Sequence, residues 1–160
     1  MTADVDNDGD SDIVGRNPVN GQWWVARSNG TSGFANELWG SWAAALVWQD
    51  LNAADVDGDD DIVGRSVVNG QWWVARSNGA SGFVNELWGG WNAAVDWQDV
   101  LIADVDGDND DDIVGRSADN GQWWVARSNG TGAFVNELWG VWNSAVSWTD
   151  VNGLEELLLV

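Results

Sequence analysis

The sequence predicts an all-β protein, and three observations lead to that prediction. Near-identical segments recur along the 160 residues, and the first aspartate of each segment is Asp4, Asp55 or Asp104. Each copy holds four short runs rich in tryptophan, valine and isoleucine, which favour strands. Asn-Gly pairs separate several of these runs, and such pairs favour tight turns. Four antiparallel strands per repeat therefore account for nearly the whole chain.

Each element of the first repeat has its own signal. An acidic loop precedes a β-branched run, and Asn20-Gly21 predicts a two-residue hairpin turn, since both central positions of that turn need positive φ. A helix is expected at most at Leu154–Leu159. The predicted strands are Ile13–Arg16, Gln22–Ser28, Phe34–Trp39, Trp48–Ala54, Ile62–Arg65, Gln71–Ser77, Phe83–Trp88, Trp97–Ala103, Ile113–Arg116, Gln122–Ser128 and Phe134–Trp139.

Four short strands in about 50 residues are the content of one β-propeller blade. A β-solenoid coil is the competing interpretation, but solenoid coils are usually shorter and pair their strands in parallel, whereas Asn-Gly turns impose antiparallel hairpins. We therefore expect a β-propeller part with four-stranded antiparallel blades, three blades per chain. The repeats are expected at residues 3–53, 54–102 and 103–153, with a closing strand at 148–160.

The acidic loops are the most specific motif in the chain. Residues 3–16 read A-D-V-D-N-D-G-D-S-D-I-V-G-R, and residues 103–116 read A-D-V-D-G-D-N-D-D-D-I-V-G-R. Both follow the spacing D-x-D-x-D-x-x-x-D, and hard oxygen ligands at this density suit calcium. An EF-hand is excluded because its twelfth position is Gly15 or Gly115 instead of glutamate, and a β-branched run follows. The loops are therefore expected in β-hairpins, and a solvated acidic turn without metal is the alternative.

Composition excludes several classes of function. Asp and Glu number 26 against 6 Lys and Arg, which gives a net charge of −20, so neither nucleic acid nor an anionic membrane surface is an expected partner. The chain has no Cys, His, Tyr or Lys, which removes most nucleophilic and acid-base chemistry. No stretch is long and apolar enough for membrane insertion, and the acidic first residues do not resemble a signal peptide. We expect no enzymatic activity.

The acidic loop, the strand N-G-Q-W-W-V-A-R-S-N-G and the following G-F together resemble the FG-GAP or VCBS repeats of integrin α-subunit propellers and of secreted bacterial and fungal proteins. The resemblance covers nearly the whole chain and implies a calcium-binding propeller with an extracellular or cell-surface location. Asn109 departs from the loop glycine, and the shortened middle loop does not map cleanly, so metal-bound and metal-free interpretations stay equally open there. The ligands that the resemblance implies are Asp4, Asp6, Asp8 and Asp12, then Asp104, Asp106, Asp108 and Asp112, with the carbonyls of Asp10 and Asp110, and in the middle loop Asp55, Asp57, Asp59 and Asp61.

Some secreted fungal lectins of that family carry a similar strand and bind sugars between blades, which motivates a carbohydrate hypothesis. An exposed tryptophan beside arginine and asparagine suits a sugar, but packing between blades is the favoured role for most of the 15 tryptophans. The arginines equally suit ion pairs with Glu37, Glu86, Glu137, Asp50, Asp99 or Asp150. The candidate ligand-binding residues are Trp24, Arg27, Asn29, Trp73, Arg76, Asn78, Trp124, Arg127 and Asn129.

Three functions remain open from the sequence. The leading one is a non-enzymatic, calcium-stabilised module for binding or adhesion, and the second is a lectin with sites between blades. The third is an engineered or recently amplified symmetric repeat protein with no ligand. A hydrolase with paired carboxylates is disfavoured, because those carboxylates lie where a metal would occupy them.

Three blades do not close a ring, because propellers have about four to eight. The chain has little inner strand before its first loop, and its last segment starts like an inner strand, W-T-D-V, at Trp148. We therefore expect a homodimer that closes a six-bladed ring, with Leu154–Val160 contributing to the neighbour's first blade.

Overall fold

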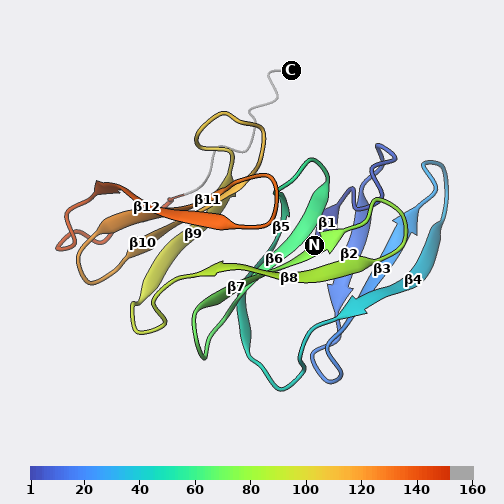
Figure 1. Ribbon diagram of the computed structural model, residues 1–160, viewed down its shortest axis with the longest axis horizontal. Coiled ribbons are helices and arrows are strands. Elements are labelled where there is room, and N and C mark those ends of the chain that lie inside the picture. Colours follow the sequence, from blue (N-terminus) through green and yellow to red (C-terminus); the bar gives the residue numbers. More distant parts are fainter. Residues whose placement is uncertain (152–160) are drawn as a thin grey trace.

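Three four-stranded antiparallel sheets follow one another along the chain in the computed structural model, which describes residues 1–151. Within these residues there is no helix, so none could span a membrane. Figure 1 shows the sheets side by side in chain order, with the second between the first and the third. The all-β class and the three blade-like units are therefore confirmed.

Each blade pairs its strands in sequence order, so that every connection within a blade is a hairpin. The first strand of each blade lies at one edge of its sheet and is called the inner strand, and the fourth, at the other edge, is called the outer strand. In the first blade the inner strand is only two residues long. The first blade contains β1 (Thr2–Ala3), β2 (Asp12–Arg16), β3 (Gln22–Ser28) and β4 (Phe34–Ser41); the second contains β5 (Trp48–Asp55), β6 (Asp60–Ser66), β7 (Gln71–Ser77) and β8 (Phe83–Gly90); the third contains β9 (Trp97–Ala103), β10 (Asp112–Ser117), β11 (Gln122–Ser128) and β12 (Phe134–Val141).

The predicted strands match the observed ones closely; β6 differs most, because it begins at Asp60 and ends at Ser66, and all three outer strands end later than predicted. β4, β8 and β12 extend two residues beyond the tryptophan at which the sequence prediction ended them. The extension is possible because the register shifts between Trp23 and Trp24, so that Trp23 pairs with Gly40 and Trp24 with Leu38. A bulge of this kind bends the outer strand and lets it continue.

The predicted two-residue turn at Asn20-Gly21 is wrong. The connection between β2 and β3 has five residues, and the Gly21 amide donates to the Asn17 carbonyl at 2.8 Å. Gly21 has a φ of 76°, whereas Asn20 is not in the positive-φ region. Glycine is required because a Cβ at Gly21 would lie 1.9 Å from the carbonyl oxygen of Trp42. The Asn20 side chain instead accepts from the Gln22 amide at 3.1 Å, as asparagine often does in turns.

The core lies between blades. Trp23 is fully buried and meets Trp42 edge to face, with ring centroids 5.2 Å apart, and Phe83 from the second blade lies 6.5 Å from it. Trp24 points to the opposite side of β3, where it is 45% exposed. The two adjacent tryptophans therefore serve opposite faces of the blade.

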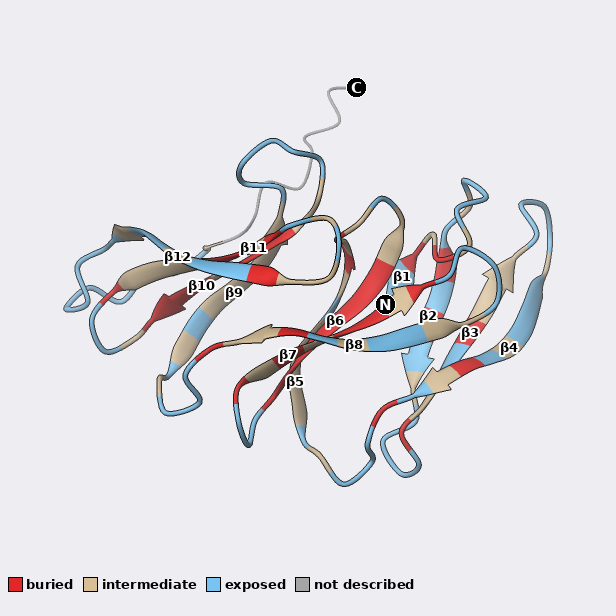
Figure 2. Cartoon of the chain, in the orientation of Figure 1, coloured by how far each residue is buried: buried red, intermediate tan, exposed pale blue. Residues whose placement is uncertain are grey.

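Burial is greatest in the middle blade. Figure 2 shows β6 mostly buried and β7 buried mainly in its second half, while parts of β4 and β12 are exposed. The difference arises because the second blade has a neighbour on both faces, whereas the first and third each have one. Leu154–Leu159, where alone a helix was allowed, and most of the predicted closing strand lie outside the described residues.

Candidate metal centres

Each acidic loop connects the inner strand of a blade to the next strand, as predicted for a β-hairpin. Positive φ angles bend the loops at Asn7 and Gly9 in the first blade, at Gly58 in the second, and at Gly107 and Asn109 in the third. Asparagine tolerates this conformation better than most residues, which explains how Asn109 stands where a glycine was expected.

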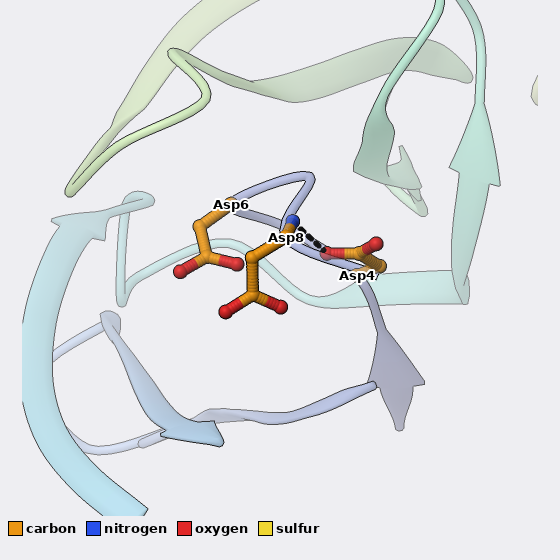
Figure 3. A group of neighbouring side chains, drawn as sticks. All are labelled: Asp4, Asp6 and Asp8. Atoms are coloured by element: carbon orange, nitrogen blue, oxygen red, sulfur yellow. Dashed lines mark hydrogen bonds between the residues drawn. The ribbon is translucent and has the colours of Figure 1, made fainter. Parts of the chain in front are cut away.

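The loops bring their carboxylates together in three groups. Within each group one oxygen from every carboxylate lies within 4.8 Å of the others. Figure 3 shows the first group, in which the Asp8 amide also donates to Asp4 Oδ1 at 3.1 Å. The groups are Asp4, Asp6 and Asp8; Asp57, Asp59 and Asp61; and Asp104, Asp106 and Asp108.

The last aspartate of each loop is buried at the start of the following strand. Asp12, Asp61 and Asp112 are all fully buried, and one oxygen of each accepts the backbone amide of Ser28, Ser77 or Ser128. The other oxygen of Asp12 and of Asp61 has no hydrogen-bond partner among the described residues. A buried carboxylate oxygen without a donor is costly, and a cation would satisfy it.

A second pair of carboxylate oxygens has the same property. Asp6 Oδ1 and Asp57 Oδ1 are buried and unpartnered within residues 1–151. Each belongs to a triad and to the same loop as one of the unpartnered buried aspartates. In the second loop both unpartnered carboxylates, Asp57 and Asp61, belong to one triad, whereas in the first loop Asp6 belongs to the triad and Asp12 begins the following strand. Unpartnered carboxylate oxygens of this kind fit a hard divalent cation.

Burial and mutual repulsion raise the pKa of several loop carboxyls. Burial raises the pKa of Asp61 to about 9, against the hydrogen bond from the Ser77 amide, and Asp57 and Asp59 raise it further. Burial also raises the pKa of Asp59 and of Asp112 to about 6. The pKa of Asp12 is raised mainly by burial. A bound divalent cation would oppose these shifts, because it favours the charged form of each ligand.

The middle loop forms a triad despite its deletion. Asp61 joins Asp57 and Asp59, whereas Asp55 is not in the group. Asp59 takes the position of Asp10 and Asp110 in the other loops, since all three lie beside the glycine that follows the third strand of the blade. A Cβ at Gly30, Gly79 or Gly130 would come within 2.3, 3.6 or 2.6 Å of their carboxylate oxygens. Shortening the loop thus draws a different aspartate into the group.

One arginine per blade joins each acidic loop to the outer strand. Arg76 pairs with Asp57 at 3.0 Å and with Glu86 at 3.2 Å. Arg27 pairs with Asp6 and Glu37, and Arg127 with Asp106 and Glu137, at 3.3 to 3.5 Å. The predicted pairs with glutamate are confirmed. The pairs with the loop aspartate were not predicted, because the sequence does not reveal that β3, β7 and β11 lie beside their loops.

Two further arginines, at equivalent positions in the second and third repeats, form a separate set of ion pairs. Arg65 pairs with Asp50 at 2.7 Å, and Arg116 pairs with Asp99 at 2.6 Å. Asp50 and Asp99 have φ angles of 54° and 52° at the point where the register of the inner strand shifts. These pairs were also predicted, and they link the first two strands of a blade.

The residues predicted to bind a sugar do not gather at one place. Trp24 and Arg27 lie three positions apart on β3, so their side chains leave opposite faces of the blade. Asn29 uses its side-chain oxygen to accept the amides of Thr31, Ser32 and Gly33 in its own turn. The other blades repeat this arrangement. The arginines pair with loop aspartates, and the asparagine side chains accept amides of their own turns; these residues are Arg76, Arg127, Asn78 and Asn129.

Two of the predicted tryptophans do line hollows between blades. Trp73 lines a hollow of about 140 Å³ with Trp42, Trp48 and Asn85. Trp124 lines an equivalent hollow of about 250 Å³ with Trp91, Trp97 and Asn136. Each hollow therefore combines indole rings with a few amides at the junction of two blades.

The chain matches no protein-family model, and it matches no curated protein. The resemblance to calcium-binding propeller repeats therefore stays a prediction, and the argument for function rests on the geometry of the acidic loops.

Proposed function

We propose that the protein is a non-enzymatic, calcium-binding β-propeller module that presents its blades for binding or adhesion. The observation that carries the proposal is the pair of unpartnered, buried carboxylate oxygens in the first and second loops, which belong to Asp6 and Asp12 and to Asp57 and Asp61. Such oxygens favour the binding of a metal cation that is coordinated by oxygen atoms.

Calcium fits these loops better than other common divalent cations. The donors are carboxylates, and the chain has neither Cys nor His, which zinc and copper prefer. Magnesium demands a nearly ideal octahedron, whereas calcium accepts the irregular sets of six to eight oxygens that a short loop supplies. In the first and third loops Asp4, Asp6 and Asp8, or Asp104, Asp106 and Asp108, would hold the ion, and in the middle loop Asp57, Asp59 and Asp61 would do so.

The proposal is tested by melting the metal-free chain with calcium, with magnesium and with EDTA. Calcium should raise the melting temperature well above its value in EDTA, and magnesium at the same concentration should raise it less. Equal melting in calcium and in EDTA would refute calcium binding. A larger effect of magnesium would refute the choice of ion.

A carbohydrate-binding role is a second candidate, and the hollows between blades favour it. The hollow beside Trp124 places three indole rings next to Asn136 and Gln122, and sugars bind by stacking on aromatic rings while amides bind their hydroxyls. A glycan array should then identify a ligand whose binding is lost in Trp124→Ala and kept in Trp139→Ala. Absence of any glycan binding by the folded chain would exclude the role.

A further inference from the structure

The two junctions between blades repeat the same contacts. Trp42 donates its indole N–H to Asn85 Oδ1 at 2.8 Å across the first junction, and Trp91 donates to Asn136 at 3.0 Å across the second. The amide of each asparagine donates back to a carbonyl of the preceding blade, at Ser41 or Gly90. The tryptophan–asparagine and asparagine–carbonyl hydrogen bonds are therefore shared by both junctions between blades.

Aromatic packing and the acidic loops complete each junction. Phe83 meets Trp39 with ring centroids 5.1 Å apart, and Phe134 meets Trp88 at 5.2 Å. The hydroxyl of Ser77 donates to the Val5 carbonyl, and that of Ser128 to the Val56 carbonyl. Each blade therefore presents a front face, with two tryptophans and an acidic loop, to the rear face of the next blade, with a phenylalanine, an asparagine and a serine.

The first blade has an uncovered rear face. Phe34, which corresponds to Phe134, is 57% exposed where Phe134 is 7% exposed. Ile13 is exposed, although the corresponding Ile62 and Ile113 are fully buried. Asn36 and Ser28 complete the same set that joins the other blades. We call this set, Ile13, Gly15, Ser28, Phe34 and Asn36, the rear face.

The third blade has an uncovered front face. Trp139 is 47% exposed, whereas Trp39 and Trp88 are 3% and 2% exposed. Trp142 is exposed as well, and with Trp123 and Trp139 it lines an open hollow of about 270 Å³. At the other junctions the corresponding space holds the phenylalanine of the next blade. We call Val105, Trp123, Trp139 and Trp142 the front face.

A glycine on the rear face shows how closely the two faces correspond. The ring of Trp42 lies over Gly64, and that of Trp91 over Gly115, so that a Cβ would come within 2.8 or 2.6 Å of a ring carbon. A Cβ at Gly15 has nothing within 4 Å among the described residues. The space over Gly15 therefore corresponds to the space that Trp42 and Trp91 fill over Gly64 and Gly115, and no tryptophan among residues 1–151 fills it.

One ion pair is divided between the two ends of the described chain. Arg65 and Arg116 each pair with an aspartate of positive φ, whereas Arg16 has a buried Nε without a partner among residues 1–151. Asp150 has a φ of 58°, close to the 54° of Asp50, and it is exposed. Asp150 thus has the backbone conformation of the aspartate that Arg16 lacks.

We propose that the front face of one chain docks on the rear face of a second copy, with Phe34 filling the hollow beside Trp123 and Trp139 and Trp142 lying over Gly15. The second copy is the occupant because its rear face offers the aromatic, amide and hydroxyl groups that the internal junctions use. Two chains joined in this way at both ends form a ring of six blades, a size that propellers adopt.

The docked copy would also complete the third acidic loop. The carbonyl of Val105 corresponds to those of Val5 and Val56, which accept serine hydroxyls from the next blade, and Ser28 of the second copy is the matching donor. This part rests on the proposed calcium binding, whereas the docking itself does not. Because coupling between two binding events is reciprocal, calcium should strengthen association by the factor by which association strengthens calcium binding at the third loop.

The experiment measures molar mass by light scattering for the whole chain and for Gly15→Leu, in calcium and in EDTA. The parent chain should give twice 17.3 kDa, and Gly15→Leu should give 17.3 kDa at the same concentration, with an unchanged β-sheet circular dichroism spectrum. The leucine has room within the chain and blocks only the position of a partner's Trp142.

Two controls separate docking from folding. Ala94→Leu adds the same side chain to an exposed loop of the middle of the chain and should leave the mass at the parent value. Gly64→Leu places leucine against the chain's own Trp42 and should lower the melting temperature, which Gly15→Leu should not do. Trp142→Ala, which alters the front face, should give the same monomer as Gly15→Leu.

Each outcome decides the proposal. A parent chain that stays at 17.3 kDa in both buffers, or a Gly15→Leu variant that keeps the parent mass, would overturn the docking. Larger species that Gly15→Leu and Trp142→Ala both reduce to monomers would uphold the two faces and overturn the ring of two chains. Equal association in calcium and EDTA would uphold docking and overturn its coupling to the third loop.

Discussion

The second and third acidic loops have almost the same residues but different surroundings. Val56 in the second loop is fully buried, because Ser128 of the next blade covers its carbonyl, whereas the corresponding Val105 is 37% exposed. Asp61 keeps one oxygen unpartnered within the described chain, while the equivalent oxygen of Asp112 accepts the Val105 amide at 3.2 Å. The covering blade therefore decides whether a loop holds a buried carboxylate in need of a cation or satisfies itself.

The difference also affects protonation. Burial raises the pKa of Asp61 to about 9 but that of Asp112 only to about 6. In the third loop, hydrogen bonds led by the Gly107 amide lower the pKa of the exposed Asp104. The sequence motif thus determines which carboxylates lie near a bound ion, and packing determines how strongly their ionised forms are destabilised without it.

Removing the buried ligand should have the largest effect. Asp61→Ala should abolish the calcium-dependent stabilisation of the middle loop, about 2.7 kcal/mol when free calcium is a hundred times its dissociation constant. Asp112→Ala should remove less, because the third loop is exposed. The measurement is urea unfolding in calcium and in EDTA, and equal losses in the two variants would break the distinction between covered and uncovered loops.

The pH dependence of the metal-free chain should show the same contrast. The pKa of Asp61 is raised to about 9 in the folded state, whereas the unfolded chain releases this proton near the ordinary aspartate pKa of 3.8. The unfolded state therefore binds fewer protons between these values, and stability should fall as pH rises through this window. Thermal melting in EDTA from pH 5 to 9 checks this.

Two variants assign that slope. Asp61→Asn removes the titrating group and should flatten the decline, while Asp112→Asn should flatten only its acidic part, below about pH 6. Saturating calcium should also flatten it, since the ion favours the ionised carboxylates. A slope that Asp61→Asn leaves unchanged would show that another group causes it.

The serine that covers the middle loop should have a smaller effect. Ser128→Ala removes the hydroxyl that donates to the Val56 carbonyl at 2.8 Å and should cost about 1 kcal/mol of unfolding free energy. Ser32→Ala, in an exposed turn, should stay within about 0.5 kcal/mol of the parent. If the two variants unfold alike, the cover over the loop contributes nothing.

The arginine pairs should have the smallest effect. Arg76→Gln breaks two partly exposed ion pairs with Asp57 and Glu86 and should cost about 0.5 kcal/mol in EDTA. Arg127→Gln should cost less, because its partners Asp106 and Glu137 are more exposed. Urea unfolding of both variants checks the order, which a larger cost for Arg127→Gln would reverse.

Much of the fold could be predicted from the sequence, because in each repeat the β-branched and aromatic runs indicate the strands, and glycine and asparagine indicate the turns between them. Gln22–Ser28 and its two copies were predicted to the residue. The Asn20-Gly21 turn was wrong, since the Trp42 carbonyl, distant in sequence, sets the conformation of Gly21.

The acidic triads were only partly predictable. Spacing indicated Asp4, Asp6 and Asp8, since residues two apart in a tight loop converge. Of the four middle-loop candidates, the sequence did not indicate that Asp55 would stay outside the group of Asp57, Asp59 and Asp61, because that depends on how the shortened loop folds. The contrast between Asp61 and Asp112 depends on a neighbouring blade, which no local pattern encodes.

The central claim is that the acidic loops bind calcium, and calorimetric titration of calcium into the metal-free chain tests it most directly. The account predicts saturable binding with one ion per occupied loop, the tighter sites in the two covered loops, and the loss of one tight site in Asp61→Ala. Absence of saturable binding up to about 1 mM calcium, the range of weak extracellular modules, would contradict it.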